Sequence, residues 1–158
     1  MGANALERMN VLETIKAYYL ESLPFNKVLG IGIDYLDYAS GEAIVSFPMA
    51  PQLIGNSSAG ILHGGVSASV IDLTGGLSAL ISCVKRHEGA SLEVIQQKIF
   101  ASATIDMRVD YLRPGRGRTF QCKSEIIRAG ARIVVAKIDL FNDEKIRIAT
   151  GTATYLIG

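Results

Sequence analysis

The chain has 158 residues, 49% apolar and 20% charged, and its 16 basic and 15 acidic side chains leave a formal net charge of +1. This length fits one core, the apolar fraction excludes intrinsic disorder, and the charge disfavours a protein that binds nucleic acid through its phosphates. Cys83 and Cys122 are too few for a disulfide framework. Glu7 and Arg8 interrupt the apolar stretch that a signal peptide needs, so we expect a reducing, cytoplasmic setting.

Residues 4–22 are predicted to form an amphipathic helix, because apolar side chains recur there at three- and four-residue steps. Pro24 is expected to end this helix. We therefore divide the chain into an N-terminal helix, residues 1–24, that packs on a single domain formed by residues 25–158.

Two short strands are expected next, at 28–35 and 43–47, joined by a turn at 38–42. Residues 48–60 are rich in Pro, Gly, Asn and Ser and are predicted to form a loop.

A long apolar helix is predicted over residues 66–84, directly after the His-Gly-Gly of residues 63–65. It is long enough to span a bilayer, but Asp72 would then lie inside the span at a cost of about 2.5–3.5 kcal/mol. We therefore expect no membrane span and a helix buried by its own chain. Within residues 85–101, the stretch from Leu92 to Phe100 is expected to add a helical turn or two.

The second half of the chain alternates polar and apolar residues, which is typical of strands. In residues 104–112 the apolar members are predicted to share the buried face: Ile105, Met107, Val109 and Tyr111. Three further strands, at 120–127, 133–141 and 146–157, are joined by short turns that imply antiparallel pairing. The predicted class is α+β, with an antiparallel sheet wrapped around the long central helix.

Asp72 is the first candidate for chemistry, because a carboxylate in the most apolar helix of a protein needs either a partner or a purpose. Such a group can act as a general base or as a nucleophile. The alternative is that Asp72 only hydrogen bonds a loop or a subunit contact.

Gly64 and Gly65 open the same helix, so their N–H groups are available to an anion or to a developing oxyanion. The alternative is a helix start that only needs flexibility. Asp72 lies about 12 Å along the helix from Gly64, too far for both to act on one carbonyl group. Two antiparallel copies of the helix about a two-fold axis would bring Gly64 of one to Asp72 of the other. We therefore expect a composite site in a homodimer, or in a tetramer built from two dimers.

Two stretches carry a family resemblance: Gly60-Ile-Leu-His-Gly-Gly65 followed by Asp72, and the run from Thr104 to Pro114 that ends in Leu-Arg-Pro. Over about residues 25–158 the chain resembles the hotdog-fold acyl-CoA thioesterases of the phenylacetate-degradation, or PaaI-like, branch. The resemblance implies a hotdog fold and the hydrolysis of an acyl-CoA thioester to a carboxylic acid and coenzyme A.

The resemblance also implies roles for individual residues. The Gly64 amide would meet the thioester carbonyl, Gly65 would contact the substrate beside it, and Asp72 would be nucleophile or base. Thr104 would help to orient the water. The family often has an Asn six residues before the His; here Ser57 stands there with Asn56 one place earlier, so either Asn56 assists the carbonyl or the role is lost.

His63 is a candidate general base, with the alternative that it bonds the backbone and holds the loop. Two histidines and no suitably spaced cysteines predict no metal site. No separate cofactor is implied, because coenzyme A is part of the substrate.

Residues 108–132 hold seven basic side chains against two acidic ones. Four of the arginines fall at predicted turns or strand ends and are candidates to bind the phosphates of coenzyme A: Arg113, Arg116, Arg118 and Arg128. The alternative is a solvated rim of turns.

Three other functions are alternatives to thioester hydrolysis. A non-catalytic module that binds acyl-CoA or lipid would bind the thioester without releasing thiol. A hotdog dehydratase usually needs a His and an acid in one pocket, and only His63 is available. A DNA-binding regulator would need an additional domain, for which the first 22 residues are too short.

Overall fold

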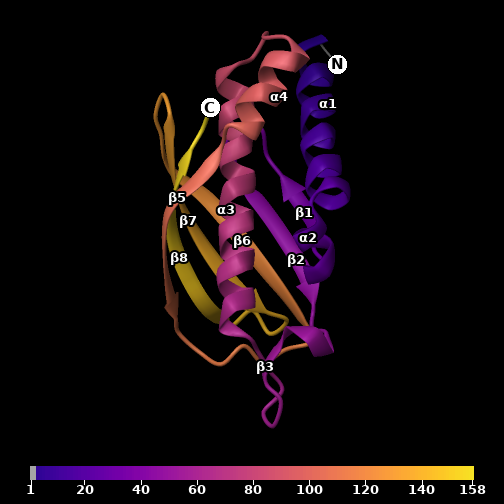
Figure 1. Cartoon of the computed structure of the whole chain (residues 1–158), viewed down its shortest axis with the longest axis vertical. Helices are drawn as coiled ribbons and strands as arrows, with labels where there is room; N and C mark the ends of the chain where they lie inside the picture. Colours follow the sequence, from indigo (N-terminus) through magenta and orange to yellow (C-terminus); the bar gives the residue numbers. More distant parts are fainter. Residues whose placement is uncertain (1–2) are drawn as a thin grey trace.

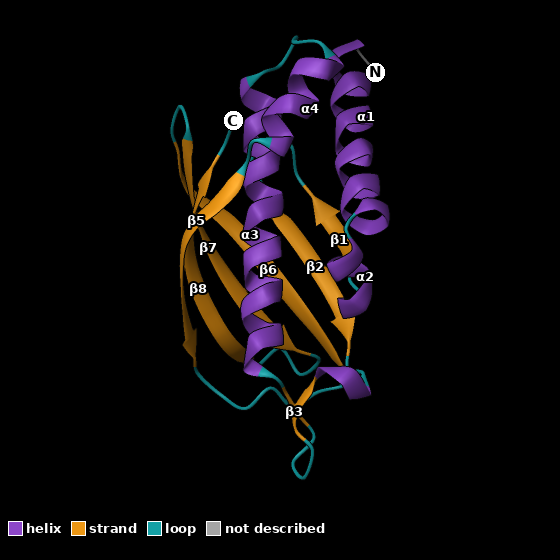
Figure 2. Ribbon diagram, in the orientation of Figure 1, coloured by secondary structure: helices purple, strands orange, loops and turns teal. Residues whose placement is uncertain are grey.

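The computed structural model describes residues 3–158, and the side chains of residues 7–91 and 93–158. Six strands form one antiparallel sheet in the order β1-β2-β6-β7-β8-β5. Their bounds are β1 Gly32–Leu36, β2 Ala43–Pro48, β5 Ala103–Tyr111, β6 Thr119–Ala129, β7 Ile133–Asn142 and β8 Arg147–Leu156. The sheet curves around one long helix, α3 (Gly64–Arg86), as predicted (Figures 1 and 2).

Helix α3 forms the centre of the core. Its inner side chains, among them Val70, Ile71, Leu77 and Ile81, are fully buried. This helix is long and apolar enough to cross a membrane, but 61% of its most apolar window is buried inside the structure. It is therefore a core helix, buried by its own chain as expected.

The N-terminal segment differs from the prediction. Helix α1 (Ala3–Ala17) continues into a π-helical stretch, η1 (Tyr18–Ser22), and a second helix, α2 (Pro24–Leu29), follows. The N-terminal helical stretch ends at Ser22, just before Pro24, as predicted. Pro24 also begins α2, which was not predicted, because the first helical position needs no backbone N–H. Val28, expected in a strand, lies in α2. The division at residue 24 remains a prediction.

Two connections carry structure of their own. The expected helical turns between α3 and the next strand are confirmed as α4 (Leu92–Phe100). The loop at 48–60 contains a 3₁₀ turn, η2 (Pro51–Leu53), and a short strand, β3 (Ile54–Asn56), which forms a small hairpin with β4 (Ile61–Leu62) just beyond the loop. Helices α1 and α4 flank the upper half of α3, whereas no helix lies in front of the lower half, where α3 begins (Figure 1).

Strand β5 forms one edge of the sheet, and a bulge breaks its alternation. The register against β8 shifts between Thr104 and Asp106, so that Thr104 lies opposite the buried Tyr155 on the face toward α3. An extra residue in one strand reverses the side that the following residues face. Ile105 was therefore wrongly placed on the buried face, and it is 55% exposed. Met107 and Val109 pack against the core as predicted, and Tyr111 shares their face and reaches Gly64 at the start of α3, although the residue is 56% exposed.

Candidate active site

Asp72 lies on α3 where the helix meets the start of β5. Its carboxylate oxygen Oδ1 accepts a hydrogen bond from the Thr104 hydroxyl, with 2.9 Å between the two oxygens. Its main-chain carbonyl accepts a second bond, also 2.9 Å, from the Tyr155 hydroxyl. Asp72 is half-buried rather than enclosed, so its carboxylate is oriented by the protein and remains accessible from outside.

The Tyr155 bond depends on a glycine. A Cβ atom at Gly75 would overlap the Tyr155 hydroxyl, so only glycine lets the strand approach α3 this closely. Burial raises the pKa of Tyr155, and the neighbouring charge of Asp72 raises it further. The phenol therefore stays protonated and acts as a hydrogen-bond donor to the helix that carries Asp72.

At the start of α3, His63 and the two glycines have different roles. The ring nitrogen Nδ1 of His63 accepts a 2.9 Å hydrogen bond from the Gly65 amide. The main-chain amide of His63 donates a hydrogen bond to the Leu53 carbonyl. The Gly65 amide, expected to be available, is thus occupied by the cap. Among the hydrogen bonds of residues 3–158, none uses the Gly64 amide. His63 therefore bonds the backbone and holds the loop, and the Gly64 amide remains free to donate a hydrogen bond.

Gly64 also has a partner on β5. The Tyr111 hydroxyl donates a 2.9 Å hydrogen bond to the Gly64 carbonyl, and its ring lies where a Gly64 side chain would reach it. Strand β5 therefore contacts the Asp72 end of the site through Thr104 and the Gly64 end through Tyr111. Within one chain the two ends stay apart, as the eight-residue spacing predicts.

Three of the four candidate arginines lie in the connection between β5 and β6, near Gly64. Each contacts the protein: Arg113 bonds the Arg147 carbonyl, Arg116 bonds the Ala59 carbonyl, and Arg118 lies 3.9 Å from an oxygen of Asp143. Arg113 lines a hollow of about 400 Å³ together with Gly64 and Tyr111, and all three line a neighbouring hollow of about 850 Å³.

Arg128 lies elsewhere. It stands near the far end of β6, opposite Val135, beside the turn to β7. Within one chain the structure does not bring it together with the three arginines of the β5–β6 connection.

Asn56 and Ser57 are both exposed at the tip of the β3–β4 hairpin. The carboxamide oxygen of Asn56 accepts bonds from the Ser58 hydroxyl, at 2.8 Å, and from the Ala59 amide, at 3.1 Å. Asn56 thus closes its own turn in this structure, and its role toward a carbonyl group remains a prediction.

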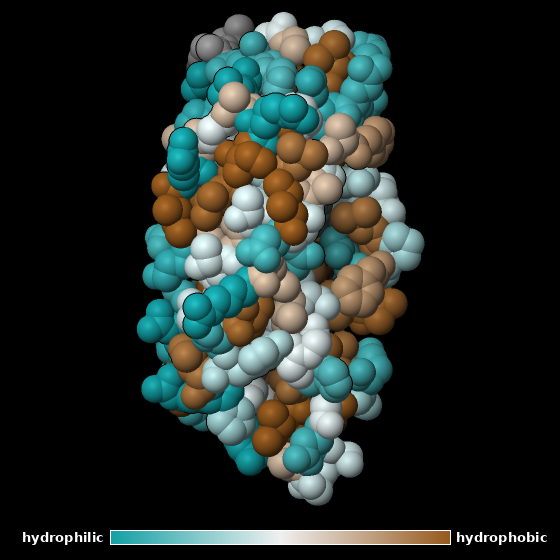
Figure 3. Space-filling model, turned by 60° about the vertical axis from the view of Figure 1, so that its left-hand side comes forward, coloured by the Kyte–Doolittle hydropathy of each residue, from teal (hydrophilic) through white to brown (hydrophobic). Residues whose placement is uncertain are grey.

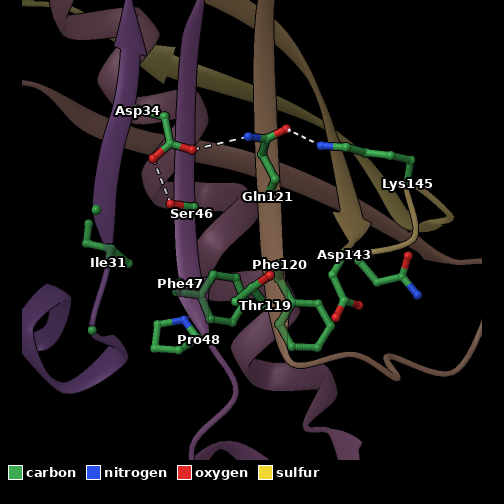
Figure 4. A pocket seen from close by; sticks show the side chains of 13 residues that line it. Ile31, Asp34, Ser46, Phe47, Pro48, Thr119, Phe120, Gln121, Asp143 and Lys145 are labelled. Carbon is green, nitrogen blue, oxygen red and sulfur yellow. Dashed lines mark hydrogen bonds between the residues drawn. The ribbon is translucent and has the colours of Figure 1, made fainter.

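A separate groove of about 580 Å³ lies across β1, β2 and β6 (Figure 4). Asp34 accepts hydrogen bonds from Ser46 and Gln121, and Lys145 bonds Gln121 in turn. These polar side chains alternate along the strands with buried residues that face α3, so the network lies on the opposite face of the sheet from Asp72. None of the candidate catalytic residues lines this groove.

Two tyrosines were missed as site residues: Tyr111 and Tyr155. Tyr155 belongs to no motif, and Tyr111, although it lies in the run from Thr104 to Pro114, was interpreted only as part of an apolar strand face. A tyrosine on such a face carries a hydroxyl that needs a partner, which is the one signal the sequence offers.

The cysteines take no part in the site. Cys83 and Cys122 are buried and free, and burial raises the pKa of both, that of Cys122 to about 12. In residues 3–158, no three His, Cys, Asp or Glu side chains gather as a metal site.

Residues 59–149, from the loop before α3 to the start of β8, match the family described as "Thioesterase superfamily". The chain belongs to the thioesterase superfamily. It is 40% identical over 147 residues to the Escherichia coli (strain K12) protein named medium/long-chain acyl-CoA thioesterase YigI, covering 93% of this chain and 94% of that one. The prediction of a thioesterase is thus confirmed.

Solved structures agree with this assignment. A crystal structure from Shewanella oneidensis, described as related to the thioesterase superfamily, has a TM-score of 0.90 at 41% identity and covers 96% of this chain and 98% of its own. The E. coli PaaI protein from the phenylacetic acid degradation operon has a TM-score of 0.71 at 20% identity over 98% and 94% of the two chains, which shows the fold alone. The predicted hotdog fold is confirmed.

Proposed function

We propose that this thioesterase hydrolyses acyl-CoA thioesters in the cytoplasm, as a homodimer or a dimer of dimers whose active sites are shared between protomers. The substrate class is supported by the name of the 40% identical relative, a medium/long-chain acyl-CoA thioesterase. The observation that carries the proposal is the Asp72–Thr104 pair, an oriented carboxylate on the uncovered side of α3.

The open edge of the sheet supports the shared site. Antiparallel pairing of β5 with β5 of a second copy would set the Thr104 end of one strand beside the Tyr111 end of the other. Thr104 contacts Asp72 and Tyr111 contacts Gly64. The same pairing therefore brings the Gly64 amide of one protomer toward Asp72 of its partner.

The surface of this edge also favours a partner. An unpaired edge strand with exposed apolar side chains is a ready template for pairing with another chain. Three large apolar side chains are exposed along or just beyond β5: Ile105, Tyr111 and Leu112. Figure 3 shows apolar surface on the face of the molecule toward which this edge is turned.

The chemistry follows from the two groups. The Gly64 N–H donates to the thioester oxygen and stabilises the negative charge that develops there. Asp72 takes a proton from water, whose oxygen bonds to the carbonyl carbon, with Thr104 holding the carboxylate in place. When the oxyanion collapses, the C–S bond breaks, and the sulfur leaves with the bonding pair and takes the proton. In a second route the Asp72 carboxylate attacks the carbonyl carbon directly, the C–S bond breaks and coenzyme A leaves as the thiolate. Water then opens the resulting anhydride to the carboxylic acid and Asp72, and the proton that it releases goes to the thiolate.

Coenzyme A would be held near the Gly64 end. Arg113, Arg116 and Arg118 lie there and are suited to bind phosphate oxygens in pairs. Coenzyme A enters as part of the substrate, so the proposal needs no separate cofactor or metal.

Asp72→Asn tests the carboxylate. We expect kcat for octanoyl-CoA, followed with a thiol-trapping dye, to fall at least about 100-fold, because the general base or nucleophile is lost. Asp34→Asn, on the opposite face of the sheet, is the matched control and should keep the native rate. An Asp72→Asn enzyme with native kcat would contradict the proposal, and binding without thiol release by the native chain would favour a non-catalytic acyl-CoA module.

A complementation experiment tests the sharing of sites. Gly64→Pro removes the N–H at the first helical position, where proline is tolerated, and its Cβ would meet the Tyr111 ring at an ordinary contact distance of 3.4 Å. Gly64→Pro and Asp72→Asn proteins should each be inactive alone. After subunit exchange, half of the dimers would be mixed, each with one intact composite site, which restores about a quarter of the native activity. Sites contained within one chain would give no recovery.

A further inference from the structure

Ser67, one turn into α3, carries a buried hydroxyl group that the rest of the chain does not bond. The residue is 5% exposed, and among residues 3–158 no side chain or main-chain group forms a hydrogen bond with this hydroxyl. The other hydroxyl side chains of α3 all have partners in the helix or in the sheet: Ser69, Thr74, Ser78 and Ser82. Since folded proteins pair nearly all of their buried polar groups, the Ser67 hydroxyl is suited to bind a ligand.

The Ser67 hydroxyl borders the hollow of about 400 Å³ at the start of α3. In the described part of the chain, no buried side-chain oxygen is completely enclosed without a hydrogen bond, so the unpaired oxygen of Ser67 keeps some exposed surface. Ser67 lines this hollow together with Gly64, whose amide is free. Two unused hydrogen-bond donors therefore border the same space.

The two donors lie close enough to act on one atom. Residues three apart in an α-helix are neighbours on one face, with Cβ positions about 5–6 Å apart. A helical side chain also leans toward the N-terminus of its helix, which directs the Ser67 hydroxyl toward the turn that begins with Gly64. An oxygen atom held between the two residues can accept a hydrogen bond from each.

The other polar groups near the start of α3 already bond the protein. The Gly65 amide donates to His63, and the Asn56 carboxamide closes its own turn. Of the three polar side chains that line the hollow, Tyr111 and Arg113 donate to main-chain carbonyls, and only Ser67 lacks a partner within the described residues.

The hollow also lies where the proposed dimer would complete a site. It is lined by Tyr111 and Leu112, at the end of β5. Antiparallel pairing of two β5 strands sets this end beside the Thr104 end of the other strand, where Asp72 is bound. A carbonyl group in the hollow would therefore have the two donors on one side and the carboxylate of the partner on the other.

We propose that Ser67 is a catalytic residue, whose hydroxyl donates a second hydrogen bond, beside that of the Gly64 amide, to the thioester carbonyl oxygen. The hydroxyl keeps its proton throughout. Negative charge develops on the carbonyl oxygen as the nucleophile bonds to carbon, and both donors hold this charge until the C–S bond breaks and the carbonyl re-forms. The inference rests on the proposed function, which supplies the thioester.

Ser67→Ala removes the donor and leaves the helix its best helix-forming residue. We expect kcat for octanoyl-CoA to fall about 100-fold with little change in KM, because the hydrogen bond strengthens as charge develops. The melting temperature should not fall, since the hydroxyl forms no hydrogen bond within the described chain. Ser82→Ala, the same change near the other end of α3, is the matched control and should keep the native rate.

Two non-hydrolysable analogues of octanoyl-CoA test the bond to the carbonyl oxygen without catalysis. A ketone in which a methylene group replaces the thioester sulfur keeps this oxygen, whereas the thioether S-octyl-CoA lacks it. In titration calorimetry, Ser67→Ala should bind the ketone up to about tenfold more weakly than the native protein does, because one neutral hydrogen bond is lost. Its affinity for S-octyl-CoA should stay native.

Ser67→Cys separates the hydrogen bond from packing, because a thiol fills the space of the hydroxyl but is a weak donor. This variant should also be slow, and it keeps the test decisive if Ser67→Ala does not fold. A native kcat in either variant, or an equal loss of affinity for both analogues, would overturn the role of Ser67. A native protein that binds the ketone with the help of Ser67 but does not hydrolyse octanoyl-CoA would overturn the proposed function alone.

Discussion

At the scale of single residues, the site depends on hydroxyl groups that orient a carboxylate. Thr104 bonds the side chain of Asp72 and Tyr155 bonds its main chain. A hydrogen bond to a charged group contributes about 1.5–3 kcal/mol, which corresponds to one or two orders of magnitude in a rate if it is needed in the transition state.

Thr104→Val should therefore lower kcat about 10- to 100-fold with a smaller change in KM, because the carboxylate loses the donor that fixes it. Thr104→Ser keeps the hydroxyl and should recover most of the rate. Steady-state kinetics with one acyl-CoA measure both variants. Equal losses in Val and Ser would show that Thr104 acts through packing rather than through its hydroxyl.

The β1–β2 turn contains a residue whose charge matters for stability. The hydroxyl and amide of Ser40, together with the amide of Ala39, hold the pKa of Asp37 below its usual range. A pKa that is lower in the folded state gives stability that is present at neutral pH and is lost as the pH falls through the folded pKa.

Asp37→Asn should accordingly lower the free energy of unfolding at pH 7 by ~0.5 kcal/mol or less, because this turn is close to solvent. The difference from the native protein should shrink toward zero as the pH falls through the folded pKa of Asp37. Urea unfolding over a series of pH values from neutral into the acid range measures it, and a constant difference would contradict the assignment.

At the scale of elements, α3 carries two adjacent glycines with different surroundings. A Cβ at Gly75 would overlap the Tyr155 hydroxyl and press on Ile138, both parts of the sheet. A Cβ at Gly76 would press on the end of the Tyr19 side chain, at 3.1 Å, and would touch the Tyr155 ring at an ordinary 3.7 Å. The two glycines therefore differ, because the close approach of the sheet requires glycine at position 75, whereas at position 76 the end of a flexible side chain can give way.

Gly75→Ala should destabilise the protein by about 1–3 kcal/mol, since either the strand or the helix must shift. Gly76→Ala should cost much less, because alanine gains up to about 1 kcal/mol in helix propensity. Thermal unfolding of both variants provides the comparison. Removing the overlapping oxygen with Tyr155→Phe should restore part of the loss in Gly75→Ala, and similar melting temperatures for the two single variants would contradict this account.

In strand β5 the polar–apolar pattern of the sequence and the observed side-chain directions differ at one place. The polar–apolar alternation of residues 104–112 predicts the strand itself, and this prediction is confirmed as Ala103–Tyr111. The alternation fails at Ile105, because the bulge depends on pairing with β8 and not on the residues of β5 alone. That bulge is what turns Thr104 toward Asp72.

At the scale of the whole molecule, the open β5 edge governs the expected assembly. A charge on an edge strand opposes pairing with another chain. Ile105, 55% exposed, lies on this edge, whereas Ile127, 58% exposed, lies near the β6–β7 turn.

Ile105→Lys should therefore shift the protein toward monomers and reduce acyl-CoA hydrolysis at least about tenfold, whereas Ile127→Lys should leave both unchanged. Light scattering coupled to size exclusion gives the mass, and a thiol-trapping dye gives the rate in the same samples. A dimeric Ile105→Lys protein with native activity would place the protomer interface elsewhere.

The amino-acid sequence alone predicted the class of fold, the central helix, the strands of the second half and the superfamily. It did so because hydrophobic periodicity and the residues at the start of α3 are local properties of the chain. Asp72, Gly64 and Thr104 were named from sequence, and the contact between Asp72 and Thr104 is present in the structure; their catalytic roles remain predictions.

Three features of the site required the folded structure: the side that Thr104 faces, the bond from the Gly65 amide to His63, and the bond from the Tyr155 hydroxyl to the Asp72 carbonyl. Each of these depends on pairing or packing between segments that are distant along the chain or on the exact geometry of a cap. Such contacts leave no periodic trace in the residues that make them, because many sequences satisfy the same local pattern.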